Sequence, residues 1–425
     1  MKINLDEIID PLEGRVVVSP DSQGQAQARF DLQGLPRIDG MLVGKSALEA
    51  LKMTEHLCGI CPVAHHLAGI RALDMLNDSA QLSRAAELTR RLLHYGSVVE
   101  THSLRFLRQD RDSGITLKKI SKKMLIAAGS PGHFPTTAVP GGVRNWPNIE
   151  DLKTLQKDLS GALTSAEKLC ELALNIQPKT AVFSQFAGID LALINEDGDP
   201  DIFGNRVRAA RAGSTWKEFD FSQWNQQITE DNPGAPAPRP YLTGLGAKEG
   251  GYRVGPVAQL SVGLLPSELA SAAQVRWLAA SRDAASARAI ITLHVLERTV
   301  ALVSELIDLL APGQLEDCPP VEQARFKEGV ATGLVDGPRG LLAHTYRTDS
   351  QGVISAATIL TPTAQNEPWL ADLLTQAISR KDASRQAVLE QSIREADPCL
   401  PLSSAPEGQM GLTVDTLQNL SLIHI

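Results

Sequence analysis

The stretch EHLCGICPVAHH, residues 55–66, decides how the rest of this 425-residue chain is interpreted. It places Cys58 and Cys61 three positions apart, with Gly59 between them. A glycine eases a tight turn, so both sulfurs can face one metal ion, and the imidazole of His65 can bind that ion or hydrogen-bond a sulfur. Half of a zinc site, a thioredoxin-like redox pair and two core cysteines remain alternatives. A zinc site needs a second ligand pair, and none follows locally. A thioredoxin motif needs a βαβ unit, and no such pattern surrounds the motif, so we favour a metal site over a redox pair.

The cysteine count supports thiols that are kept reduced. The chain has an odd number of them, which argues against a disulfide framework and for metal or redox chemistry; they are Cys58, Cys61, Cys170, Cys318 and Cys399. Cys399 stands in the stretch DPCLPL, residues 397–402. A lone cysteine is normally a small buried hydrophobe, so this stretch gains weight only in combination with the first.

Composition narrows the class of protein. The chain is 43% hydrophobic and 21% charged, with a net charge of −8, and it has no cluster of Lys and Arg. Nucleic-acid binding needs such a cluster to neutralise phosphates, so we exclude it as the main function. No window approaches the roughly 18–20 apolar residues of a membrane helix, and the N-terminus carries acids where a signal peptide carries an apolar run. We therefore expect a cytoplasmic protein without membrane contact.

Periodicity predicts a largely helical α+β fold with a small β-hairpin at the N-terminus. Residues 15–19 and 26–32 form the hairpin, and strand content is expected to be low after it. Apolar residues at helical spacing and capping signals predict helices over 83–107, 149–174, 367–378 and 384–395, and a long pair over 267–310. Stretches rich in Gly and Pro, 128–148 and 229–262, are predicted to be loops.

We find no repeat and no linker, so residues 1–405 are expected to form one domain, followed by a tail over 406–419. The last six residues, LSLIHI over 420–425, match the translated end of a transposon-based sequencing library. We expect them to be an assembly artefact and exclude them from the chemistry.

Taken together, the two cysteine stretches resemble the metal-binding ends of the large subunits of nickel-iron hydrogenases. That family holds its metals with an N-terminal Cys-Gly-x-Cys-x3-His and a C-terminal Asp-Pro-Cys-x2-Cys-x2-His. The resemblance runs from about residue 9 to residue 401 and implies the family's helical large-subunit fold. It implies that Cys58, Cys61 and Cys399 bind metal and that His65 lies beside them.

Further segments resemble the same family in the same order. The stretch 9–15 matches the family's opening segment, so Glu13 corresponds to a proton-passing glutamate, and Asp39 falls where the family has a metal-coordinating glutamate. Residues 133–143 are similar to a family His-Pro…Gly-Gly loop. The resemblance implies that Arg339, in DGPRG, projects over the iron, and that Pro362 and Thr363, in TPTAQN, hold its cyanide ligand. Without the family resemblance, we would interpret Arg339 as an ordinary turn residue and Thr363 as a helix cap.

The chain also departs from the family pattern. Leu402 stands at the position of the fourth cysteine, Ala405 stands at that of the terminal histidine, and His56 replaces an arginine. Leucine has no lone pair, so a nickel ion would lose one of four thiolates, and the adjacent Ser403 and Ser404 are poor ligands for soft metals.

These departures predict a site that holds iron and not nickel. The resemblance then implies a non-catalytic maturation scaffold of the hydrogenase expression/formation type, HupK/HoxV, that transiently carries iron with cyanide and carbon monoxide ligands. Its expected partners are an iron-delivering maturation chaperone, the iron-ligand assembly proteins and, as the acceptor, a hydrogenase large subunit. The alternatives are a divergent catalytic or hydrogen-sensing large subunit, and a metal-free interaction protein that keeps the fold.

Overall fold

The computed structural model describes most of the chain, namely residues 13–21, 23–32, 38–77, 82–130, 132–176, 186–235, 237–280, 282–311, 324–380 and 385–416. Cys318 and the suspected artefact at 420–425 lie outside these ranges, as do residues 9–12. Among the helices described, none combines the length and the apolar character needed to cross a bilayer.

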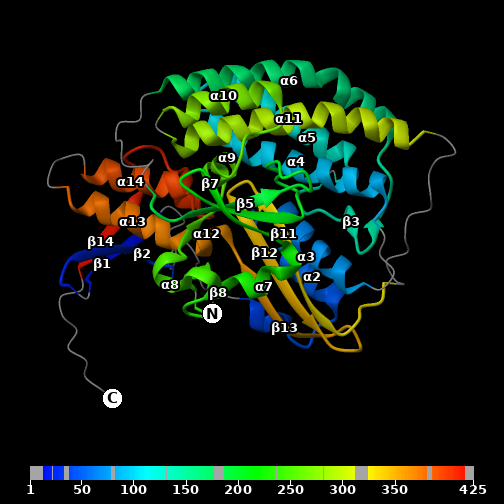
Figure 1. Cartoon of the computed structure of the whole chain (residues 1–425). Coiled ribbons are helices and arrows are strands. Elements are labelled where there is room, and N and C mark those ends of the chain that lie inside the picture. Colours follow the sequence, from blue (N-terminus) through cyan, green and yellow to red (C-terminus); the bar gives the residue numbers. More distant parts are fainter. Residues whose placement is uncertain are drawn as a thin grey trace, which may run out of the picture.

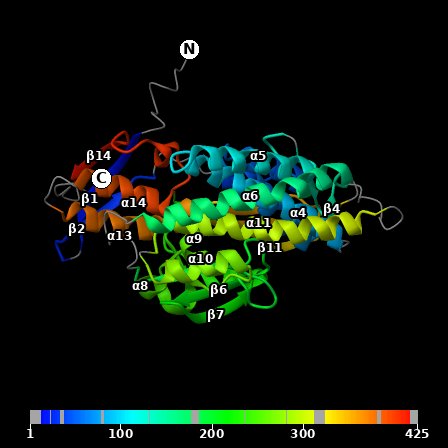
Figure 2. The ribbon, with the colours of Figure 1, turned by 90° about the horizontal axis from the view of Figure 1, so that it is seen from above.

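One layer of the molecule is a bundle of long helices (Figures 1 and 2). The helices predicted over 83–107, 149–174 and 267–310 are confirmed, the last as a pair. Each long helix, except the one that begins after Ser267, opens on a side chain that accepts a backbone N–H, such as Ser83 and Asp283. The layer comprises α4 (Arg84–Phe106), α5 (Arg111–Ala127), α6 (Ile149–Asn175), α10 (Glu268–Leu278) and α11 (Ala284–Leu309).

Two sheets lie beneath this bundle, in regions for which the sequence periodicity predicted no strands. Strands β5 (Ile189–Ile194), β6 (Arg206–Arg211), β7 (Ser214–Asp220) and β10 (Tyr252–Arg253) pair in the order β10-β5-β6-β7. The antiparallel sheet β11-β12-β13 comprises Gly329–Gly337, Gly340–Thr348 and Ile354–Leu360. Every residue of β5 and most of β11 are buried, so these strands lack the apolar-polar alternation that marks a half-exposed strand.

The predicted N-terminal hairpin is confirmed as β1 (Glu13–Pro20) and β2 (Ala26–Phe30). The segment expected to be a tail contains β14 (Gly411–Thr416), which pairs in parallel with β1. This three-stranded sheet packs beside α13 (Glu367–Ile378) and α14 (Arg385–Ala396), both close to their predicted bounds, at one end of the molecule (Figure 2).

Both predicted loops contain short elements that sequence periodicity could not reveal. Residues 128–148 hold β3 (Ala138–Val139) and β4 (Gly142–Val143). The region from Phe221 to Ser261 holds η3 (Phe221–Gln223), α7 (Trp224–Gln227), β8 (Ile228–Glu230), β9 (Pro240–Leu242), η4 (Thr243–Leu245), α8 (Gly246–Glu249), β10 and α9 (Pro256–Ser261). Elements of two to six residues are too short to show a period.

The remaining elements include those that flank the cysteine stretches. They are α1 (Asp39–Leu42), α2 (Ala47–Glu55), α3 (Pro62–Leu76), α12 (Pro362–Gln365) and η6 (Pro401–Ser404). Helix α3 packs closely on β11, where Gly333 lets the two backbones approach. A β-carbon at position 333 would lie 2.0 Å from the carbonyl oxygen of Ala68 and 2.4 Å from the amide nitrogen of Ala72.

We therefore expect Gly333→Ala to force α3 away from β11 and to lower the free energy of unfolding by about 3 kcal/mol. Chemical denaturation followed by circular dichroism measures this change. Gly161→Ala in α6 is the matched control, since nothing lies within 4 Å of its added β-carbon, and alanine should stabilise that helix by about 1 kcal/mol. Equal effects of the two substitutions would contradict the close packing.

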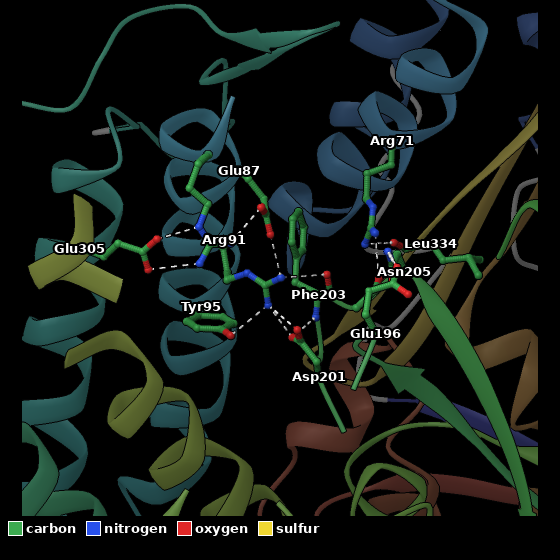
Figure 3. A network of polar contacts seen from close by, with 12 residues as sticks. Arg71, Glu87, Arg91, Tyr95, Glu196, Asp201, Phe203, Asn205, Glu305 and Leu334 are labelled. Carbon is green, nitrogen blue, oxygen red and sulfur yellow. Dashed lines mark hydrogen bonds and ion pairs between the residues drawn. The ribbon is translucent and has the colours of Figure 1, made fainter. Parts of the chain in front are cut away.

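A polar network fastens α3 and α4 to the loop before β6 (Figure 3). Arg91 of α4 binds Asp201 through both carboxylate oxygens, at 2.6 and 2.5 Å. Arg71 of α3 donates to the carbonyls of Leu334 and Gly204, both at 2.8 Å. The network thus fixes the strand that leads into the turn at residues 338–339, which belongs to the site described next.

Candidate metal site

Local sequence positions the first two thiols. Helix α2 ends at Glu55, and Pro62 opens α3 at its first position, where a missing N–H costs nothing. Cys61 is the residue before that proline, and Cys58 lies in the short loop between the helices. The rigid packing of α3 on β11 therefore fixes the position of Cys61.

The third thiol comes from the other end of the chain. Cys399 follows α14, and its sulfur lies 3.4 Å from that of Cys58 and 4.0 Å from that of Cys61. The sulfurs of Cys58 and Cys61 are 3.4 Å apart. The three predicted metal-binding cysteines thus meet at one point, although 338 positions separate Cys61 from Cys399.

The three thiols share hydrogen bonds that differentiate their acidities. Hydrogen bonds from Cys399 and Cys61 lower the pKa of Cys58 to about 2. Hydrogen bonds with Cys399 and Cys58, together with burial, raise the pKa of Cys61 well above its ordinary value. The hydrogen bond with Cys58 raises the pKa of Cys399. One negative charge is therefore shared by the cluster, and a metal ion must displace the remaining protons.

His65 completes a donor set for a metal. One ring nitrogen lies, with the sulfurs of Cys58 and Cys61, in a group of atoms all within 4.8 Å of one another. His65 Nδ1 is 3.0 Å from His344 Nε2, and His344 Nδ1 is 2.8 Å from the hydroxyl of Tyr346. Burial lowers the pKa of His65 to about 4, so this imidazole is neutral at pH 7 and able to bind a metal.

The cysteines line a cavity of about 170 Å³. Its walls are largely apolar and include Leu57, Ala64, Pro338 and Leu342, and its charged lining residue is Arg339. A single ion fills only a small part of such a volume. The cavity has room for a metal that carries further small ligands.

The turn between β11 and β12 presents Arg339 to this cavity. Gly340 has a φ of +130°, and a β-carbon there would lie 2.8 Å from the amide nitrogen of Gly255, so the turn requires glycine. The Arg339 guanidinium is buried, and its Nε and Nη1 have no hydrogen-bond acceptor within the described part of the chain. Burial would lower the pKa of Arg339, but Asp397 and the cysteines raise it, so the group stays charged.

Pro362 and Thr363 belong to α12, and both line the cavity. The Thr363 hydroxyl oxygen accepts the backbone N–H of Cys399 at 2.7 Å. The capping role considered for Thr363 is wrong, because Thr361 caps α12 by accepting the N–H of Ala364. The Thr363 hydroxyl hydrogen remains able to donate a further hydrogen bond.

Asp397 anchors the C-terminal side of the site. Its carboxylate contacts Arg105 at 2.5 Å, Arg288 at 3.3 Å and Arg339 at 3.5 Å. Burial would raise the pKa of Asp397, but Arg339 and the other two guanidinium groups lower it to about 2. No sequence signal indicated a role for Asp397, because nothing in the local sequence reveals its partners on α4 and α11.

One predicted site residue, Asp39, is not among the described residues that line the cavity. Asp39 accepts the backbone N–H of Ile359 at 2.9 Å, so it fastens α1 to β13. Glu13 begins β1, and only its backbone pairing with Gly411 is described. Their proposed roles in the site therefore stay predictions.

The position of the family's fourth cysteine is filled by a core side chain. Leu402 is 2% exposed, does not line the cavity, and lies 3.1 Å from where a β-carbon on Gly14 would be. The nearby carbonyls of Ser403, Ser404 and Ala405 are bound by Arg105 and Arg108. In the part of the chain that the structure describes, the cavity therefore offers three thiols and one imidazole.

This donor set suits a soft or borderline metal. Thiolates and an imidazole favour zinc, iron or copper over calcium or magnesium. The unpaired N–H groups of Arg339 and the hydroxyl of Thr363 add donors for small anionic ligands of such a metal.

Other buried histidines form hydrogen bonds with core residues. His102 contacts the Thr292 hydroxyl and the Pro338 carbonyl, and His66 pairs with Glu55. His94 contacts the Asp336 carbonyl at 2.8 Å. These imidazoles hold the site's framework.

Buried groups predict a stability maximum near pH 6.5. Burial lowers the pKa of His65, His94, His102 and His294 to about 4, so acid favours unfolding as the pH falls from about 6.5 towards 4. Burial raises the pKa of Asp336 to about 7 and of Glu395 to about 8, so unfolding releases their protons and alkali favours it up to pH 8. Below pH 6.5 the imidazoles outnumber the carboxyls. Above it the two carboxyls outweigh the Cys58 thiol, whose lowered pKa acts in the opposite direction, until Asp336 has ionised near pH 7.

Urea denaturation at pH 5, 6.5 and 8 measures this profile. Asp336→Asn keeps an acceptor for the N–H of Leu193 and should flatten the alkaline limb. A stability that rises steadily from pH 6.5 to 8 in the unmodified protein would contradict the assignment.

Comparisons with known proteins agree with the fold. Residues 37–109, which include Cys58 and Cys61, match the family described as nickel-dependent hydrogenase. A subunit of the F420-non-reducing hydrogenase vhu of Methanococcus voltae is 25% identical and aligns over 86% of this chain and 94% of its own length. The NAD-reducing hydrogenase HoxS subunit beta of Cupriavidus necator is 26% identical, with 96% of each chain aligned.

A solved structure gives the same result. The crystal structure of an NAD+-reducing NiFe-hydrogenase in the H2-reduced state superimposes with a TM-score of 0.78 at 26% identity, covering 91% of this chain and 95% of that one. The predicted fold, a mostly helical body with small sheets, is confirmed. None of these relatives carries the name of the expression/formation type.

Proposed function

We propose that this chain, a large-subunit-like relative of the nickel-dependent hydrogenases, is a maturation scaffold whose cargo is iron bearing cyanide and carbon monoxide. The observation that carries the proposal is the number of thiols in the cavity. Cys58, Cys61 and Cys399 converge, whereas Leu402 occupies the fourth position with an apolar core side chain. Three soft donors suffice to hold iron, while nickel would lack one thiolate of the family's set.

The shape and polarity of the cavity support such a cargo. A volume of about 170 Å³ accommodates an iron ion together with small ligands, and the walls are largely apolar. Arg339 brings a buried positive charge, and its Nε and Nη1 have no acceptor among the described residues, which suits the negative end of a cyanide. Thr363 holds Cys399 and keeps its hydroxyl hydrogen for a second acceptor.

The protein's own residues would take up the cargo by exchanging protons for metal. Cys58 is already the acidic member of the thiol cluster, so it is the first ligand to bind. Cys61 and Cys399 then lose their protons as they bind, and His65 is neutral and available. Release to an acceptor reverses these steps, and reprotonation of the two less acidic thiols favours it.

This proposal defines the partners. An iron-delivering maturation chaperone and the iron-ligand assembly proteins would supply the cargo, and a hydrogenase large subunit would accept it. Transfer requires that the thiol cluster be reachable, and Gly59, between the two N-terminal cysteines, is exposed.

A second candidate function is that of a divergent catalytic or hydrogen-sensing large subunit. The relatives favour it, because those named above are hydrogenase subunits and they align over almost their whole length. This function requires nickel beside the iron, bound with no more than the three thiols described. The two functions therefore differ in their metal content.

Infrared spectroscopy with iron and nickel counted on the same sample distinguishes them. The full chain is purified anaerobically from a host that carries the maturation genes. Cyanide and carbon monoxide bands with about one iron and almost no nickel are expected of the scaffold. Bands with equal nickel would establish the catalytic or sensing class, and neither bands nor metal would leave an interaction protein.

A further inference from the structure

A second, much smaller cavity lies next to Arg339. It has a volume of about 10 Å³, which is room for about one water molecule. Its polar lining comes from Arg288, Arg339, Asn366, Glu395 and Asp397. Arg339 also lines the thiol cavity, so this residue borders both spaces.

Arg339 is incompletely held by the protein. Its Nε lies 3.5 Å from Asp397, beyond a good hydrogen bond, and Nε and Nη1 are both buried without an acceptor in the described chain. Asp397 is already engaged by Arg105 and Arg288. A buried guanidinium needs acceptors for its N–H groups, and the small cavity is lined by Arg339 together with a second buried acid.

Glu395 is that acid, and the thiol cavity does not use it. It is 3% exposed, and its Oε1 accepts the N–H of Ala284 at the start of α11 at 2.7 Å. Burial, and then Asp283, raise the pKa of Glu395 to about 8, while Arg288 and Arg253 act in the opposite direction. Glu395 is therefore a neutral acid at pH 7 and an anion above pH 8.

We propose that Glu395 is a positioning residue for Arg339, which it contacts through one water molecule in the small cavity. The water accepts an N–H of Arg339 and exchanges a hydrogen bond with the carboxyl group of Glu395. With Glu395 neutral, the guanidinium remains directed to the thiol cavity. With Glu395 ionised, the new charge attracts the guanidinium towards the small cavity and weakens its contact with the cargo.

The inference rests on the proposed function for its first test, which uses the iron-loaded protein. Cyanide stretching bands are recorded from pH 6 to 10 in the unmodified chain, in Glu395→Gln and in Asp336→Asn. Glutamine keeps an acceptor for Ala284 and cannot ionise. Asp336 is the matched control, since it is another buried acid with a raised pKa and it does not line either cavity.

We expect the bands of the unmodified protein to shift with a midpoint near pH 8, those of Glu395→Gln to stay constant, and those of Asp336→Asn to shift as in the unmodified protein. A merely structural role for Glu395 would move stability and leave the band positions unchanged. A shift that persists in Glu395→Gln, or no shift in the unmodified protein, would overturn the proposal.

A second test needs no cargo, so it stands if the scaffold function fails. A crystal structure of the metal-free full chain at pH 6.5 and about 1.5 Å resolution should show one ordered water within hydrogen-bond distance of both Arg339 and Glu395. A dry cavity, or a guanidinium that contacts Asp397 alone, would overturn the proposal even if the iron cargo were established.

Discussion

Cys61→Ser is expected to abolish loading with iron and to remove the cyanide and carbon monoxide bands. Cys61 lies within 4.0 Å of both other sulfurs and is fixed by the start of α3, so it cannot be replaced by a neighbour. A serine hydroxyl is a hard, weakly acidic ligand that binds soft metals poorly. We expect iron affinity to fall by at least about 100-fold, since even residues outside the ligand shell cost 10- to 100-fold.

Metal analysis and infrared spectra of the anaerobically purified variant measure this loss. Cys170→Ala is the matched control: Cys170 is a free, buried cysteine of α6 that does not line the thiol cavity. The control should retain iron and bands at the level of the unmodified chain. Equal loading of Cys61→Ser and Cys170→Ala would remove the thiol cluster from the proposed function.

The sequence predicted the amphipathic parts of the fold well. The helix predicted over 367–378 has those bounds in the structure, and α4 and α6 differ from their predictions by one residue or so, because a polar face and capping residues mark them. Helix α3 was not predicted, since it is buried almost all round and shows no polar face. The strands β5 and β11 were missed for the same reason.

The candidate site shows the same division between local and distant information. Spacing alone suggested that Cys58 and Cys61 share a metal, and the position of both sulfurs within 4.8 Å of a ring nitrogen of His65 agrees with it. The roles of Cys399, Arg339 and Thr363 depended on resemblance to a family, because their contacts span tens to hundreds of positions.

Some features of the site could not be predicted from the sequence of this chain alone. The partners of Asp397 come from α4, from α11 and from the β11–β12 turn, and only the fold brings them together. Glu395 is one acid among many in the sequence, and its burial is what gives it a role. Asp39, in contrast, matched a family position by order along the chain, and the structure shows it bonded to β13.

The second large effect is expected from Asp397→Asn, which should lower the free energy of unfolding by about 3 kcal/mol. The substitution keeps the shape of the side chain but leaves Arg105, Arg288 and Arg339 close together without a counter-charge. Asp397 has a φ of 45°, in the left-handed region, and asparagine tolerates that region about as well as aspartate. The loss therefore reports the charge and not backbone strain.

Urea denaturation from pH 8 to pH 3 measures both the size and the origin of this effect. The pKa of Asp397 is about 2 in the folded protein and about 3.9 in an unfolded chain. Its contribution is thus fully present above pH 4 and is lost as the pH falls towards 2, so the variant should approach the unmodified protein in acid.

Asp158→Asn is the matched control, because Asp158 pairs with Lys123 on the surface and such pairs contribute about 0–1 kcal/mol. A difference below 1 kcal/mol for Asp397→Asn, or one that is as large at pH 3 as at pH 7, would contradict the assignment. If the effect has the expected size and pH dependence, the three-arginine cluster is held by one carboxylate two residues from Cys399. Neutralising that carboxylate should then loosen both Arg339 and the third thiol, so Asp397→Asn should also reduce iron loading while Asp158→Asn should not.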